Sequence, residues 1–288
     1  RTPFLDHPGA EARGVAFADA LGITGPDQLT RLREVPPDEL YDLVRAATRL
    51  GDHYPTIDGH VIPTSPFAAF ANRQQADVPF VIGSNANEGT LIQPLFDAPM
   101  VEYRYRPVPD DAVPVEMQQA FGDDLARLLP HYPGLDVGEP GAQIDFLGDH
   151  MFGAPAHWYA RHHATAGHPT WLYHFARTPP SKKQTVGAFH AAELTFVHGS
   201  SVPILPMSDD DKALGATMRQ HWTAMARSGN PNEGADTGGP KWPDYTPTDP
   251  QWIRFDHTVD VEPVTKLEVY GVLDARLERV LRDMESAS

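Results

Sequence analysis

The sequence contains no cysteine, which excludes disulfide bonds and thiolate metal sites within these 288 residues. No apolar run approaches the ~18 residues that a transmembrane helix requires. Basic side chains are also scarce, because 23 lysines and arginines stand against 39 aspartates and glutamates, for a net charge of −16. A charge of this sign repels nucleic-acid phosphates and anionic lipid surfaces. We therefore expect no nucleic-acid partner and no membrane partner.

A serine-nucleophile motif is missing as well. The pattern G-x-S-x-G, which marks the nucleophile elbow of many hydrolases, occurs nowhere in the chain. Ser200 and Ser201 follow a His-Gly pair, but H-G-S-S lacks the two flanking glycines of the elbow. We therefore expect no catalytic nucleophile within this sequence.

The residues that are present are typical of a loop-rich enzyme domain. Apolar side chains make up 41% of the chain, enough for a sizeable core, and 29 prolines are spread along it. Strands bounded by glycine or proline are predicted at 79–84, 170–175 and 252–255, where apolar and aromatic residues cluster. Apolar periodicity and capping residues predict helices over 9–22, 27–33, 38–49, 146–165, 209–228 and 273–284.

Strands that alternate with long helical stretches favour an α/β fold with a mainly parallel central sheet and flanking helices. Three strands would make a narrow sheet, and so we expect further strands outside this sequence.

Two short segments carry the residue types of hydrolytic chemistry. GSNANEGT at 83–90 places Glu88 just after an apolar run, and GAFHAAELTFVHG at 187–199 places His190 in a loop that begins with glycine. A carboxylate that orients an imidazole supplies two of the three members of a hydrolytic triad. Taken alone, Glu88 fits a loop cap equally well, and His190 is one of 14 histidines. Neither residue identifies a site by itself.

Four segments in order along the chain resemble the type B carboxylesterases, the family that includes cholinesterases and para-nitrobenzyl esterases. PFVIGSNANEG at 79–89 resembles the family's acid motif, and GAFHAAELTFVHG resembles its histidine motif. IDGHVIP at 57–63 resembles the stretch before the acid strand, and HWTAMARSGNPN at 221–232 with KWPDY at 241–245 resembles the late helix and its sequel. The resemblance covers most of residues 15–280. It implies an α/β-hydrolase fold and a Ser-Glu-His triad in which Glu88 is the acid and His190 the base.

The resemblance further implies that residues 1–288 form the C-terminal portion of one α/β-hydrolase domain. The nucleophile elbow and the oxyanion loop would belong to the N-terminal portion of the same protein, which would then be this chain's partner. The substrate would be a small-molecule ester, no cofactor would be needed, and the isolated chain would be inactive. The alternative is a non-catalytic adhesion or binding module that keeps the fold and loses the triad.

The sequence departs from the family's pattern at three positions in these motifs. Asn87 stands where aspartate is common, Ala191 where glycine is common, and His198 where phenylalanine is common. These changes leave the two triad positions intact and put the packing of the loops in question. Glu193, three residues after His190, is predicted to be a structural hydrogen-bond partner rather than a second catalytic acid.

Other clusters favour structural roles. His150, His157, His162 and His163 crowd one predicted helix without an H-E-x-x-H pattern, so we expect surface and groove residues and no metal site. Asp209, Asp210 and Asp211 lack the spacing of a calcium loop and are expected to complement the helix dipole. Four aromatic or methionine side chains are expected to line either an ester pocket or the core: Phe96, Met151, Phe152 and Trp158.

Overall fold

Two compact units, Arg1–Pro66 and Phe67–Ser288, divide the chain. The structure, a computed structural model, describes residues 10–46, 55–92, 113–179, 181, 184–200 and 206–287. The expectation that residues 1–288 form part of one domain stays a prediction.

The first unit contains three helices close to those predicted: α1 (Ala10–Ala20), α2 (Gln28–Glu34) and α3 (Pro37–Ala46). Asp27 occupies the N-cap position at the start of α2, although its side chain makes no capping hydrogen bond. The predicted start of α3 at Asp38 is one residue late. The helix begins at Pro37, where a missing N–H costs nothing, and Asp38 lies in its first turn. Residues 47–49 of this prediction lie outside the described residues.

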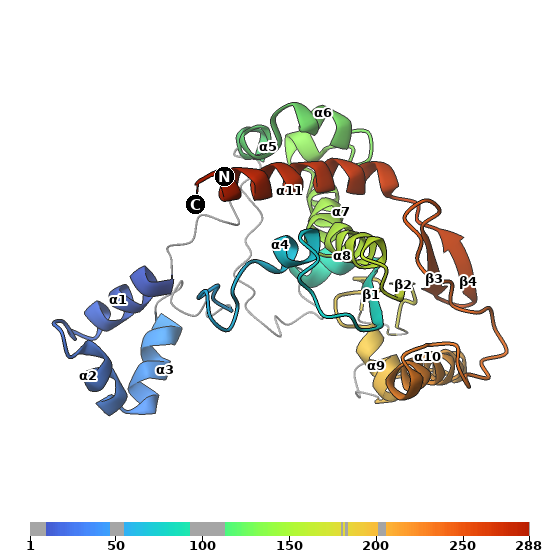
Figure 1. The fold of residues 1–288 in the computed structure, drawn as a ribbon, viewed down its shortest axis with the longest axis horizontal. Helices are drawn as coiled ribbons and strands as arrows, with labels where there is room; N and C mark the ends of the chain where they lie inside the picture. Colours follow the sequence, from blue (N-terminus) through green and yellow to red (C-terminus); the bar gives the residue numbers. More distant parts are fainter. Residues whose placement is uncertain are drawn as a thin grey trace. The chain divides into compact units, whose positions relative to one another are not determined.

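A four-stranded sheet in the order β1-β2-β3-β4 lies at the centre of the second unit (Figure 1). Strands β1 (Phe80–Asn85), β2 (Thr170–Phe175) and β3 (Gln251–Phe255) are parallel and confirm the three predicted strands. The fourth strand, β4 (Val259–Pro263), runs antiparallel to β3 and was not predicted. Its valines alternate with acidic residues, which fits a half-exposed edge strand but contains no apolar run, and a hairpin pairs it with β3.

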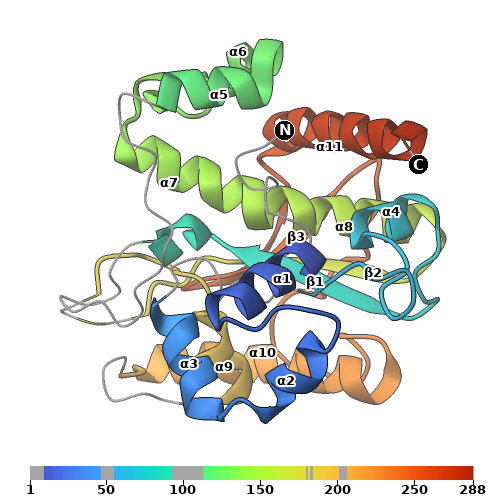
Figure 2. The same cartoon turned by 90° about the vertical axis from the view of Figure 1, so that its left-hand side faces the viewer.

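Helices cover both faces of this sheet (Figure 2). One layer contains α7 (Pro140–Gly148), α8 (Ala154–Thr165) and α11 (Leu267–Ala287), and the other contains α9 (Glu193–His198) and α10 (Asp209–Ser228). Because side chains alternate along a strand, neighbouring residues enter different cores. Leu172 packs with the α7, α8 and α11 layer, whereas Trp171 and Phe175 pack with the α9 and α10 layer.

The helix predicted over 146–165 is interrupted in the structure. A π-helical turn, η4 (Asp149–Gly153), separates α7 from α8. Pro155 follows in the first turn of α8 and lacks the N–H that a continuous α-helix needs at that position. Single π turns within helices are rare and occur frequently at functional sites.

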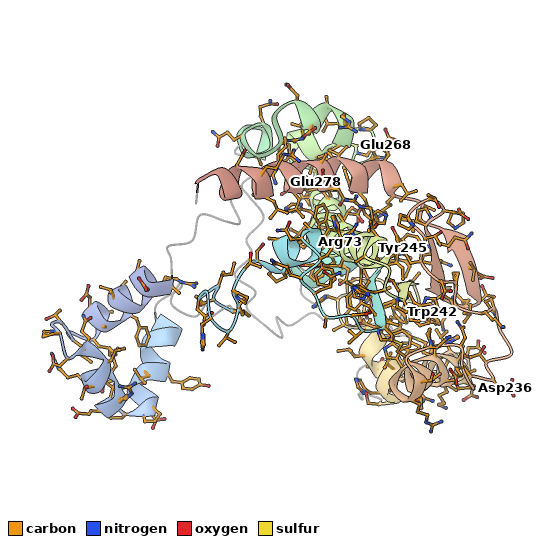
Figure 3. All side chains as sticks on the ribbon, in the orientation of Figure 1. Arg73, Asp236, Trp242, Tyr245, Glu268 and Glu278 are labelled. Atoms are coloured by element: carbon orange, nitrogen blue, oxygen red, sulfur yellow. The ribbon has the colours of Figure 1, made fainter. Side chains whose placement is uncertain are left out.

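The prediction of a helix over 209–228 is confirmed by α10. Ser208 and Asp211 form a reciprocal capping box at its start, and Gly229 ends it with a φ of 76°. The loop that follows carries Trp242 and Tyr245, both labelled in Figure 3. The indole N–H of Trp242 donates to the carbonyl of Leu172 at 2.9 Å, which fixes this loop against β2.

Shorter helices complete the second unit and its boundary: α4 (Pro66–Ala71), α5 (Val113–Phe121), α6 (Leu125–Leu128) and the 3₁₀ turns η1 (Glu88–Ile92), η2 (Gly122–Asp124) and η3 (Leu135–Val137). The closing helix α11 begins six residues before the predicted Leu273. Within the part of the chain that the structure describes, we find no helix with the length and apolar character needed to cross a bilayer.

Candidate active site

Glu88 lies at the carboxyl end of β1, which is the edge where parallel sheets collect their reactive side chains. The strand ends at Asn85, and Glu88 opens the 3₁₀ turn η1 three residues later. Its side chain is buried, and each carboxylate oxygen has its own donor. Oε1 accepts the backbone N–H of Asn85 at 2.8 Å, and Oε2 accepts Nδ1–H of His190 at 2.7 Å.

His190 reaches Glu88 because its loop is paired with the loop after β1. Asn87 and Phe189 form a parallel bridge, and the backbone N–H of Asn87 donates to the carbonyl of Ala188 at 3.1 Å. The side chain of Asn87 adds a second contact, since its Oδ1 accepts the N–H of Ala188 at 2.9 Å. The asparagine at this position therefore holds the two loops together.

Ala191 adopts the left-handed conformation, with a φ of 67°. This explains the family's preference for glycine at the position, because a Cβ in that conformation costs roughly 1 kcal/mol. The backbone at Ala191 is the same turn that a glycine would make without strain. It directs the chain from His190 into α9.

The electrostatics of the pair favour a charged imidazole. The hydrogen bond that His190 donates to Glu88 raises the pKa of His190 above its usual 6.5, and this outweighs the lowering that partial burial causes. The side chain of His190 is 43% exposed, whereas that of Glu88 is 8% exposed. The pair is thus a buried acid that presents an accessible imidazole.

Glu193 lies in the first turn of α9, one helical turn after His190, and does not bond to the imidazole. Its Oε2 accepts from the side-chain amide of Asn85 at 2.5 Å. Burial raises the pKa of Glu193, and the hydrogen bond from Asn85 opposes that rise. The predicted triad positions are therefore together in the structure, and Glu193 is bonded to a neighbour of the pair.

Of the aromatic and methionine side chains weighed for a pocket, Phe152 is the one that touches the pair. The rings of Phe152 and His190 have centroids 4.7 Å apart and planes inclined by 42°. The π turn η4 brings Phe152 there, beside the half-buried Met151. Trp158 is a core residue with 0% of its surface exposed, and Phe96 lies outside the described residues.

The expectation of surface positions for the four helical histidines is wrong for two of them. His157 and His163 are buried, and Nε2 of His163 donates to the carbonyl of Val78 at 2.8 Å. Burial also lowers the pKa of His150 to about 4. Within the described ranges, no cluster of three or more histidines, aspartates or glutamates is arranged to hold a metal ion.

Asp211 differs from the neighbouring aspartates with which it was grouped. It is fully buried, and its Oδ1 accepts Nε–H of Arg177 at 2.6 Å. Asp209 and Asp210 are exposed in the first turn of α10, and the dipole expectation for all three aspartates misses this ion pair. Of the two serines rejected as nucleophiles, Ser200 is exposed after α9, and Ser201 lies outside the described residues.

Sequence reasoning missed Asn85 and the clamping role of Asn87. The pattern N-x-N-E within 85–88 contains the available signal, because two amides precede the acid at the end of a strand. Their partners lie about a hundred residues away, and the sequence alone does not specify such contacts.

Comparison with known proteins assigns the chain to a family. A family model described as "Carboxylesterase family" matches residues 3–271. The chain belongs to the carboxylesterase family. This carboxylesterase chain is 30% identical over 211 residues to carboxylesterase 1D of Rattus norvegicus, covering 66% of this chain and 35% of the relative. It is 28% identical over 274 residues to the para-nitrobenzyl esterase of Bacillus subtilis (strain 168), covering 88% of this chain and 50% of the relative.

A solved structure described as "PNB esterase" superposes on the carboxylesterase chain with a TM-score of 0.71 at 26% identity, covering 92% of this chain and 54% of the other. The predicted resemblance and the predicted α/β-hydrolase fold are thereby confirmed. The chain spans 35% to 50% of the length of the curated relatives cited here.

Proposed function

We propose that this chain supplies the acid and the base of a Ser-Glu-His triad in a carboxylic ester hydrolase. The observation that carries the proposal is the 2.7 Å hydrogen bond between Nδ1 of His190 and Oε2 of Glu88. It joins residues 102 positions apart at the carboxyl edge of a parallel sheet. In this arrangement Glu88 fixes the imidazole tautomer and Nε2 is left for proton transfer.

The reaction proceeds in two halves. Nε2 of His190 takes the proton of a serine hydroxyl while the serine oxygen attacks the ester carbonyl, and the same nitrogen then protonates the departing alkoxide. A water molecule, deprotonated by His190, hydrolyses the acyl-enzyme and releases the acid. Glu88 remains ionised throughout and stabilises the imidazolium that forms in each half.

The serine and the oxyanion donors come, in this proposal, from the N-terminal portion of the same protein, outside the 288 residues. The substrate is a small-molecule ester, and the chemistry requires no cofactor. Loss of a single oxyanion donor costs about 10²–10³ in rate, and the chain alone lacks both the donors and the nucleophile. We therefore expect no burst of product when these 288 residues meet a chromogenic ester.

A fluorophosphonate probe and a para-nitrophenyl ester test the proposal on the protein that joins this chain to its N-terminal portion. We expect the probe to label a serine outside residues 1–288, and His190→Ala to lower kcat by about 10⁴–10⁶-fold and to abolish labelling. Glu88→Gln should also lower kcat, because the amide offers one acceptor where the carboxylate offers two, to the Asn85 N–H and to Nδ1–H of His190. His131→Ala is the matched control, since His131 pairs with the exposed Glu268 away from the site.

Three results would contradict the proposal: ester turnover by the 288 residues alone, labelling of a serine within them, or wild-type turnover by His190→Ala. A joined protein that is folded but takes up no probe and hydrolyses no ester would favour the adhesion or binding module. Such a module has no use for the ordered pair of Glu88 and His190, and we prefer the hydrolase for that reason.

A further inference from the structure

Asn85 lies between two carboxylates, the buried Glu88 and the half-buried Glu193, and bonds to both of them. It is the last residue of β1, and only 4% of its surface is exposed. Its backbone N–H donates to Oε1 of Glu88 at 2.8 Å, while its side-chain amide donates to Oε2 of Glu193 at 2.5 Å. One residue therefore separates the acid of the proposed triad from a second acid of the same chemical type.

The same amide also holds the histidine loop. Nδ2 of Asn85 donates a second hydrogen bond, at 2.8 Å, to the carbonyl of Phe189, the residue before His190. The two protons of one nitrogen thus bond on both sides of His190, to Phe189 and to Glu193. Among side chains of this size, only a carboxamide offers two donors on one atom without adding a charge.

Glu193 acts electrostatically on the imidazole of His190. The charge of Glu193 contributes to raising the pKa of His190, after the larger effect of Glu88, and His190 in turn acts on the pKa of Glu193. Tyr173 on β2 also interacts with the two carboxylates, and burial together with their charges raises its pKa. A histidine that faces two carboxylates needs a structural reason to bond to one of them.

We infer that Asn85 is a positioning residue that directs His190 to Glu88 by binding Glu193 and the Phe189 carbonyl. This role rests on the proposed hydrolase function, but the hydrogen bonds that define it do not. With the Asn85 amide in place, Glu193 has its donor and the imidazole has a single partner. Without it, Glu193 is a half-buried carboxylate with no donor from β1, and such a group gains free energy by turning to the nearest cation.

Asn85→Leu tests this role when it is made in two backgrounds, one that keeps Glu193 and one that carries Glu193→Gln. Leucine has the branched outline and the same number of side-chain heavy atoms as asparagine, and it has no donor. With Glu193 present, we expect Asn85→Leu to lower kcat about 10²-fold, with KM within about threefold, because a misplaced base loses orientation but not substrate binding. In the Glu193→Gln background we expect a loss of about tenfold or less, because a neutral amide does not compete for the imidazole.

A second measurement requires no ester. The Cε1–H resonance of His190, followed against pH in protein labelled at histidine, reports its pKa directly. Asn85→Leu should shift this pKa when Glu193 is present and should shift it much less in the Glu193→Gln background. Asn232→Leu is the matched control: Asn232 also bridges backbone groups through its amide, to Trp242 at 2.8 and 2.9 Å, and touches no member of the site.

The outcomes separate this inference from the proposed function. Equal decreases of kcat in the two backgrounds, or an unchanged His190 pKa after Asn85→Leu, would overturn the positioning role. Neither result would contradict the hydrolase function. A reference protein that hydrolyses no ester would overturn the proposed function, and the titration would still decide the role of Asn85. A shift of the His190 pKa by Asn232→Leu as large as that by Asn85→Leu would reduce Asn85 to a packing residue and also overturn the inference.

Discussion

Gly187 and Asn87 approach so closely that no side chain fits between them. A Cβ on Gly187 would lie 2.1 Å from Oδ1 of Asn87 and 2.6 Å from its Cγ. The same Oδ1 accepts the N–H of Ala188, so Asn87 has little freedom to move away. This contact closes the loop of His190 onto the loop of Glu88, and the glycine is required for steric as well as conformational reasons.

Gly187→Ala should therefore damage both the fold and the site. The φ of Gly187 is +70°, a conformation that costs alanine roughly 1 kcal/mol, and displacement of Asn87 adds to this loss. If His190 shifts by about 1 Å as the loops separate, kcat falls by about 10²-fold. Urea unfolding and the turnover of a chromogenic ester measure the two effects separately.

Gly234→Ala is the matched control for the conformational cost. Gly234 has a φ of +72°, and a Cβ there would meet nothing within 4 Å. This variant should lose only the backbone contribution to stability and keep its turnover. Equal losses of stability and activity in the two variants would show that the contact between Gly187 and Asn87 has no effect of its own.

The acid limb of the pH–rate profile should reflect the bond between His190 and Glu88. His190 must be neutral to accept the serine proton, and its pKa lies above 6.5 because Glu88 stabilises the imidazolium. Turnover should therefore fall as the pH drops through a midpoint above 6.5. Glu88→Gln removes the negative charge, so its midpoint should move to a lower pH while its plateau rate decreases.

Profiles of kcat/KM measured from about pH 5 to pH 9, a range that brackets the free-histidine pKa of about 6.5, check this shift. Glu268→Gln serves as the control, because Glu268 pairs with the surface residue His131 and not with the site. A Glu88→Gln midpoint equal to that of the reference protein would mean that Glu88 does not set the pKa of His190.

The strands and the longest helix could be predicted because their signals are local. Residues 170–175 are apolar or aromatic and are bounded by proline and charge, and residues 209–228 begin with acids and end at glycine. The π turn in η4 and the strand β4 could not be predicted in this way. The first depends on how Pro155 fits into a packed helix, and the second on a hairpin partner, β3, which supplies the hydrogen bonds.

The candidate site divides along the same line. Glu88 and His190 lie in short motifs that resemble those of a family, and the sequence therefore identified both as candidate residues. Asn85 was not singled out, because its role depends on acceptors at Phe189 and Glu193, more than a hundred positions away. Such contacts exist only after β1 and the histidine loop have been placed side by side.

Asp211 was expected to complement the helix dipole, but the structure places it in a buried ion pair with Arg177. Three aspartates in a row open α10, yet the side chain of Asp209 is 97% exposed and that of Asp211 is fully buried against Arg177. Burial alone would raise the pKa of Asp211, but hydrogen bonds from Arg177 and Ser208 outweigh it and leave the pKa lowered. Asp211→Asn leaves the Arg177 guanidinium buried without its counter-ion, which costs about 3–5 kcal/mol for pairs of this kind.

Urea unfolding of Asp211→Asn and Asp209→Asn at neutral pH compares the two positions directly. Asp209→Asn should leave the midpoint unchanged, because its pair with Lys212 is open to solvent. A carboxyl whose pKa is lowered by folding stabilises the native state above its unfolded pKa, and this contribution disappears as the pH falls through the folded value. The difference in the free energy of unfolding between Asp211→Asn and the reference protein should therefore be full at pH 7 and decrease below about pH 3.8. A gap that stays constant down to pH 2, about two units below the pKa of a free aspartate, would contradict the ion pair as its cause.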